Sequence, residues 1–129
     1  MFLADTNIFL EVLLAGDNSE SCKTFLLNNL GRIHISDFSL HSIGVILFRQ
    51  RQEMIFNDFF EDISENTHII SLSKESYVKL PEIKQRFNLD FDDAYQFQVA
   101  QDLNLAIVTM DKDFNRVKGE LEVVSIVSP

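Results

Sequence analysis

Aspartates follow two short apolar segments near opposite ends of the chain. Phe2–Ala4 is followed by Asp5, and the apolar, partly β-branched residues 105–109 end just before Asp111. In open α/β sheets, ligands collect beyond the carboxyl ends of the strands. If both segments are parallel strands of one sheet, Asp5 and Asp111 therefore lie together at that edge. The alternative role for each is to cap the following helix or turn, which aspartate also favours.

Two further acids, Asp92 and Asp93, fall in the first turn of a predicted helix that ends near Leu103. The helix dipole favours acids there whatever the function. Carboxylates that come within a few ångströms of one another repel unless a proton or a cation lies between them. Because Mg²⁺ and Mn²⁺ prefer oxygen ligands, convergence of Asp5, Asp93 and Asp111 predicts a divalent-metal site. Such an ion can activate a water for attack on a phosphodiester.

Composition limits the class of protein. The 129 residues, 46% of them hydrophobic, suffice for one domain over residues 1–129. No apolar run approaches the ~20 residues of a membrane span and no basic leader is present, so we expect a soluble, cytoplasmic protein. The single Cys22 cannot form an internal disulfide, which fits a reducing compartment. The net charge of −9 disfavours general nucleic-acid binding but suits a carboxylate cluster counted without its metal.

Strand-like and helix-like segments alternate along the chain. Apolar runs predict strands at 2–4, 33–36, 69–72, 105–109 and 122–127. Helical spacing predicts helices at 8–13, 19–30, 40–48, 54–63, 74–88 and 92–103, with a turn or short helix at 111–116. Pro81 should kink or divide the segment 74–88. The alternation predicts a three-layer α/β/α sandwich whose central, mostly parallel sheet has four to five strands.

Two of the predicted helices carry more specific expectations. The helix over 40–48, capped by Asp37 or Ser39, is apolar nearly all round and should be buried on most sides. The next helix has phenylalanines at helical spacing, which indicates a stripe facing the core. Exposure near Phe59 and Phe60 would instead mark a surface for a partner.

Three blocks of this sequence resemble the best-marked blocks of PIN domains. They are Phe-Leu-Ala-Asp-Thr-Asn at 2–7, Leu-Asp-Phe-Asp-Asp-Ala at 89–94 and Ile-Val-Thr-Met-Asp-Lys-Asp-Phe at 107–114. PIN domains are small metal-dependent ribonucleases, and many are the toxins of VapBC-type toxin–antitoxin pairs. The resemblance implies an α/β/α sandwich, Mg²⁺ or Mn²⁺ as cofactor and endonucleolytic cleavage of RNA. It also implies an antitoxin partner and a homodimer.

By this resemblance, Asp5, Asp93 and Asp111 take the places of the family's metal ligands and catalytic residues. Accessory positions near them are Thr6, Asn7, Ser42, Asp92 and Asp113. The basic residues best placed to contact RNA phosphates are Lys112, Arg116 and Lys118, beside Asp111, with Arg49 and Arg51 at the end of the third helix. Ordinary solvated surface is the alternative for these five.

The resemblance fails at one place. The family's third helix carries a glutamate a few residues after a Ser or Thr cap, and here that place falls on Ser42. No acid lies between residues 38 and 52, so the predicted site lacks one of four carboxylates and should bind metal more weakly. Asp37, Asp92 or His41 could compensate. An active three-carboxylate nuclease and a catalytically degenerate PIN domain that binds protein or RNA both stay open.

Other families with acids at strand ends fit less well. A haloacid-dehalogenase-type phosphatase needs a second aspartate where Asn7 stands. A phosphoreceiver domain needs paired acids after the first strand and a later lysine, and only parts of that pattern are present.

Overall fold

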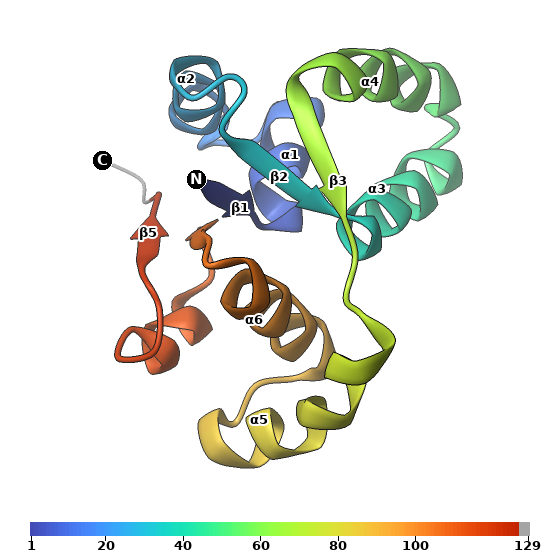
Figure 1. The fold of residues 1–129 in the computed structure, drawn as a ribbon. Coiled ribbons are helices and arrows are strands. Elements are labelled where there is room, and N and C mark those ends of the chain that lie inside the picture. Colours follow the sequence, from blue (N-terminus) through green and yellow to red (C-terminus); the bar gives the residue numbers. More distant parts are fainter. Residues whose placement is uncertain (127–129) are drawn as a thin grey trace.

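A computed structural model, which describes residues 1–126, shows a five-stranded sheet between two layers of helices (Figure 1). The strands are β1 (Phe2–Ala4), β2 (Ile33–Ser36), β3 (Thr67–Ile70), β4 (Ala106–Thr109) and β5 (Val123–Ser125). Their order in the sheet is β3-β2-β1-β4-β5, and every neighbouring pair is parallel. The predicted α/β/α sandwich with a central parallel sheet is confirmed.

The helices divide between the two faces of the sheet. One face carries α1 (Thr6–Leu13), α2 (Ser19–Asn28), α3 (Asp37–Arg49) and α4 (Glu53–Asn66). The other carries α5 (Leu80–Phe87), α6 (Phe91–Leu103) and the 3₁₀ helices η1 (Lys74–Lys79) and η2 (Lys112–Val117). Because successive strand residues face opposite ways, Leu3 packs in the α6 layer and Ala4 in the α1 layer. Each face of the sheet therefore has its own core.

The centre of the sheet sets the position of the acids. Ala4 of β1 pairs with Val108 of β4, and the backbone N–H of Asp5 donates to the Val108 carbonyl at 2.9 Å. β1 ends there, and α1 begins at the next residue. The carboxyl end of β1 therefore lies beside that of β4, as the convergence of Asp5 and Asp111 requires.

Several segments differ in detail from the expectations. β3 begins at Thr67, two residues earlier than predicted, because its four residues pair in register with all of β2. Leu72 has already left the sheet, and its backbone N–H donates to the Tyr95 hydroxyl at 2.9 Å. β5 is shorter than predicted, and residue 127 of the predicted strand lies outside the described residues. Pro81 stands in the first turn of α5, where η1 meets it, so two helices replace one as expected.

The expectations for α3 were wrong on two points. Its N-cap is Ser36, whose hydroxyl accepts from the Ser39 backbone N–H at 3.0 Å, so neither Asp37 nor Ser39 is the cap. It is also not buried on most sides. Only Ser39, Ile43 and Leu47 are buried, and Phe48 is 60% exposed, because α1, α4 and β2 cover one side of this outer helix. Within residues 1–126, no helix combines the length and apolar character needed to cross a membrane.

Candidate metal centre

Asp5 serves as helix cap and cavity wall at once. It is the N-cap of α1, and its Oδ1 accepts from the Thr6 backbone N–H at 2.9 Å. Its Oδ2 accepts from the Thr109 hydroxyl at 2.9 Å, and the side chain is 8% exposed. Two donors on different elements thus fix the carboxylate, and a fixed carboxylate suits a ligand as well as a cap.

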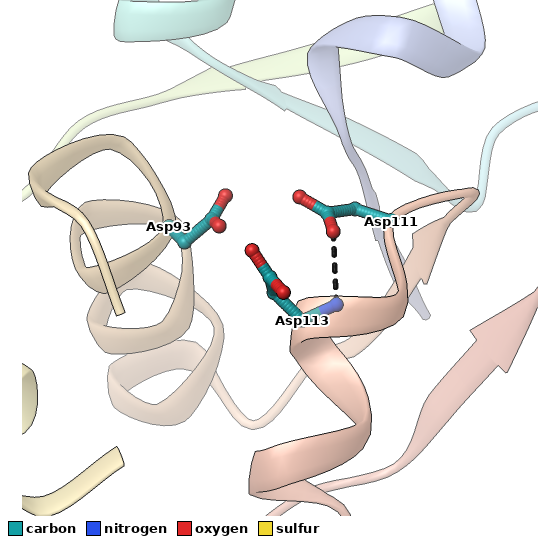
Figure 2. A group of neighbouring side chains, drawn as sticks. All are labelled: Asp93, Asp111 and Asp113. Atoms are coloured by element: carbon teal, nitrogen blue, oxygen red, sulfur yellow. Dashed lines mark hydrogen bonds between the residues drawn. The ribbon is translucent and has the colours of Figure 1, made fainter. Parts of the chain in front are cut away.

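Three further carboxylates converge from two sides (Figure 2). Asp93 projects from the first turn of α6, whereas Asp111 and Asp113 come from the end of β4 and the start of η2. One oxygen from each lies within 4.8 Å of the other two. The Asp113 backbone N–H donates to Asp111 Oδ1 at 2.9 Å, which holds this turn closed. Figure 2 shows all three carboxylates directed toward a common space.

This crowding changes the proton affinity of the site. Burial raises the pKa of Asp93 from its ordinary 3.8 to about 8, and Asp90 and Asp111 add to the increase. Burial also raises the pKa of Asp5, against the opposing hydrogen bonds from Thr109 and Thr6. Without a cation, the site therefore holds a proton near neutral pH. An all-oxygen, anionic donor set of this kind fits Mg²⁺ or Mn²⁺.

The acids line a cavity of about 450 Å³ at the carboxyl edge of the sheet. All three predicted ligands border it, and so do four predicted accessory residues, namely Thr6, Asn7, Ser42 and Asp92. Asp113 does not border this cavity but belongs to the carboxylate group of Figure 2. The structure therefore brings together, from α1, α3, α6, η2 and the N-caps of α1 and η2, the residues that the sequence pattern singled out.

Ser42 borders the cavity from α3, and among the described residues no acid of α3 does so. Of the compensating residues considered, Asp37 and His41 are exposed and do not border the cavity, and only Asp92 does. Asp90 also borders the cavity, although the sequence analysis did not select it. It caps α6 by accepting from the Asp93 backbone N–H at 2.9 Å. Its place three residues before Asp93 is the sequence signal that could have found it.

The predicted phosphate contacts are placed less favourably. The Arg116 guanidinium donates to the Asn88 carbonyl at 2.7 Å and pairs with Asp113 at 3.1 Å, so it is already engaged. The exposed residues Lys112 and Lys118 lie at the two ends of η2. Arg49 and Arg51 lie at the end of α3. Among the residues that the structure describes, none of these five borders the cavity.

Sequence reasoning missed Gln96 and Ser39. Both are buried, Gln96 borders the cavity, and its Nε2 donates to the Ser39 hydroxyl at 2.6 Å. The available signal was a glutamine one turn after Asp93, in a helix whose residues 93–100 are all buried. A buried amide of this kind requires polar partners.

Comparisons with known proteins agree with this architecture. A family model described as PIN domain matches residues 2–120. A toxin–antitoxin complex from Klebsiella pneumoniae superposes with a TM-score of 0.81 at 24% identity, and 100% of both chains is covered. For the toxin VapC20 of Mycobacterium tuberculosis, described as cleaving the sarcin-ricin loop, the TM-score is 0.80 at 17% identity over 100% of both chains.

A further solved structure has the same fold. VapBC2 of Rickettsia felis, bound to a DNA fragment from its promoter, gives a TM-score of 0.73 at 20% identity, covering 96% of this chain and 97% of that one. Identities this low establish similarity of fold alone. No curated protein matches this chain.

Proposed function

This chain belongs to the PIN domain family, and we propose that it is a Mg²⁺- or Mn²⁺-dependent endoribonuclease and the cytoplasmic toxin of a toxin–antitoxin pair. The observation that carries this proposal is the convergence of Asp93, Asp111 and Asp113 beside the buried Asp5. Four carboxylates at one sheet edge are tolerable together when a cation neutralises them. The family supplies RNA as the expected substrate.

Each residue has a defined part in this proposal. Asp5, Asp93 and Asp111 would hold the ion, and Asp113 would add a fourth carboxylate from η2. Thr109 and the Thr6 backbone N–H keep the Asp5 carboxylate in one orientation. Asp93 must release its proton before it can serve as a ligand, because its pKa is raised in the metal-free site. When bound, the ion supplies Lewis acidity and an activated water for phosphodiester hydrolysis.

The direct test is cleavage of single-stranded RNA with and without Mn²⁺. We expect cleavage by the wild type that requires the metal, and its loss in Asp5→Asn and Asp93→Asn. The matched control is Asp17→Asn, which makes the same charge change at an exposed loop residue and should cleave normally. Metal-dependent cleavage that survives in both site variants would contradict the assigned residues.

A second function is favoured by one observation, namely that Ser42 borders the cavity where the family carries an acid. In this alternative the chain is a degenerate PIN domain that binds protein or RNA without cleaving it. Isothermal titration with Mn²⁺ separates the two, because absence of heat at millimolar metal supports the binding module. Ser42→Glu should raise the affinity for Mn²⁺ if residue 42 faces the site as proposed.

The proposed antitoxin has a suitable surface away from the acids. A groove of about 460 Å³ lies between α1, α2 and α4, and its lining is mostly apolar. Three apolar residues at the groove are also exposed: Leu27, Leu30 and Ile55. Solved structures of the same fold include toxin–antitoxin complexes. We propose that an apolar segment of the antitoxin occupies this groove, because the groove buries apolar area only when a partner fills it.

Co-purification with a candidate antitoxin tests the groove. Leu27→Glu combined with Ile55→Glu should abolish co-purification and leave Mn²⁺ binding unchanged, because a carboxylate buried in an apolar contact is costly. Val78→Glu is the control, since Val78 is 79% exposed and lies on the opposite layer. Equal capture of the antitoxin by all three proteins would place its binding surface elsewhere.

A further inference from the structure

Among the residues that the structure describes, Gln96 is the one buried side-chain amide that borders the acidic cavity. It lies on α6 one turn after Asp93, is 1% exposed, and borders the cavity together with Ser42. Its Nε2 donates to the Ser39 hydroxyl at 2.6 Å and, at 3.5 Å, to Asp5 Oδ1. Its Oε1 is buried and has no hydrogen-bond partner among the described residues.

The Asp5 carboxylate indicates which end of this amide is which, because it offers acceptor oxygens to the amide atom 3.5 Å away. The Ser39 oxygen accepts from the Ser36 hydroxyl at 3.1 Å and from Gln96. Its single proton is therefore left for the Thr6 hydroxyl, 2.7 Å away. The amide nitrogen is needed between Ser39 and the Asp5 carboxylate, both of which offer acceptors. The Gln96 oxygen must consequently lie on the other side, without a donor.

A buried acceptor without a partner is costly, so one on a residue that borders a candidate metal cavity points to a missing ligand. Carbonyl oxygens are ligands that Mg²⁺ and Mn²⁺ accept. This cavity is also the place where position 42 lacks an acid. We propose that Oε1 of Gln96 donates a neutral oxygen to the coordination shell of the divalent ion, in place of the carboxylate absent at Ser42. This inference rests on the metal site proposed above.

Gln98 provides a matched control on the same helix. It is 2% exposed, and its Nε2 donates to Asp102 Oδ1 at 2.7 Å, away from the acidic cavity. Gln98→Leu removes the same chemical group from a buried site that holds no acid cluster. Any effect shared by Gln96→Leu and Gln98→Leu therefore reports on packing in α6 and not on the ion.

The experiment is titration of the whole metal-free protein with Mn²⁺. Binding is monitored by calorimetry and, independently, by the EPR signal of free Mn²⁺. We expect Gln96→Leu to weaken binding by about 10-fold or more and Gln98→Leu to leave it within twofold of wild type. Gln96→Glu should bind Mn²⁺ more tightly than wild type because it supplies a charged oxygen. A role limited to holding Ser39 and Asp5 predicts the opposite, since glutamate also lacks the amide N–H donors.

The outcomes separate this inference from the proposed function. If the wild type does not bind Mn²⁺, the metal site fails and this inference fails with it. If the wild type binds and Gln96→Leu matches Gln98→Leu, only the role of Gln96 is overturned. Equal weakening by leucine and glutamate at position 96 also overturns it. Should Gln96→Leu not fold, as judged by circular dichroism, Gln96→Met gives the same comparison with a side chain of similar length.

Discussion

The ionisation of Asp93 should affect stability across neutral pH. Its pKa is raised to about 8 in the folded, metal-free protein, mainly by burial and then by Asp90. The stability that this group contributes is therefore complete below about pH 4 and is lost as the pH rises through about 8. As the pH rises from about 4 to about 8, the free energy of unfolding of Asp93→Asn should increase relative to that of the wild type by up to about 1.4 kcal/mol per pH unit. Urea unfolding in EDTA at several pH values measures it.

Two comparisons sharpen this prediction. Asp17→Asn, at an exposed loop residue, should follow the wild-type pH curve. Saturating Mn²⁺ should remove the advantage of Asp93→Asn, because the cation stabilises the ionised carboxylate of the wild type. Parallel pH curves for the wild type and Asp93→Asn would show that Asp93 titrates normally.

Positions at element ends made the location of part of the candidate site predictable. Asp5, Asp93 and Asp111 each stand where a strand ends or a helix begins, and the sequence pattern locates such places without knowledge of the packing. Gln96 could not be found in this way, since its importance depends on which turn of α6 faces the sheet edge. Nor could the hydrogen bond from Arg116 to the Asn88 carbonyl, because Asn88 lies 28 residues away, whereas the i,i+3 spacing of Asp113 and Arg116 was visible in the sequence.

At the scale of elements, the start of α6 determines where Asp93 points. Asp90 caps this helix through the Asp93 backbone N–H, and it also repels the Asp93 carboxylate. Asp90→Ala should lower the free energy of unfolding by about 1 kcal/mol, because the cap is lost. Asp90→Asn keeps a capping oxygen and should stay within a few tenths of a kcal/mol of wild type. Urea unfolding near neutral pH compares the two variants. An equal loss in the free energy of unfolding for both would mean that the charge of Asp90, and not its capping hydrogen bond, stabilises α6.

The elements that were predicted well are those whose boundaries have a local cause. Pro81 divides η1 from α5 because it lacks a backbone donor, which is visible in the sequence. β3 was displaced because its start is set by its pairing with β2, a contact between distant segments. The burial of α3 was overestimated for a related reason. Its apolar residues have no partner on the outer side in this chain, and hydrophobicity alone does not tell a core from an exposed apolar surface.

At the scale of the whole molecule, that exposed surface predicts self-association. Phe48 of α3 packs edge-to-face on Phe56 of α4 at 5.9 Å between ring centroids, and Phe56 stacks on Phe60 at 6.4 Å. Phe48 and Phe60 are 60% and 40% exposed. We expect a homodimer through this surface, because contiguous exposed apolar groups mark interfaces. Phe48→Lys should give a monomer in sedimentation equilibrium and change the free energy of unfolding of that monomer by less than about 0.5 kcal/mol.

Val78→Lys is the control for the dimer, because it adds the same charge at a highly exposed apolar residue on the other layer. It should remain dimeric. A wild type that sediments as a monomer at every concentration tested would rule out this use of the aromatic surface.

The charge of the molecule predicts how RNA binding depends on salt. The chain carries a net charge of −9, and of the five predicted phosphate contacts Arg116 is engaged by Asp113 and Asn88. For single strands, the logarithm of affinity falls with the logarithm of salt by about 0.7 for each phosphate neutralised. If only Lys112 and Lys118 contact phosphates, the slope should be about −1.4, whereas contact by all five residues gives about −3.5. Fluorescence anisotropy of labelled single-stranded RNA with Asp93→Asn, which should not cleave, measures this slope.

Two substitutions in the Asp93→Asn protein test which residues contact phosphates. Lys112→Ala should make the slope shallower by about 0.7, while Arg49→Ala should leave the slope unchanged. A slope near −3.5 that becomes equally shallower in both variants would instead assign RNA binding to a surface that extends from η2 to the end of α3.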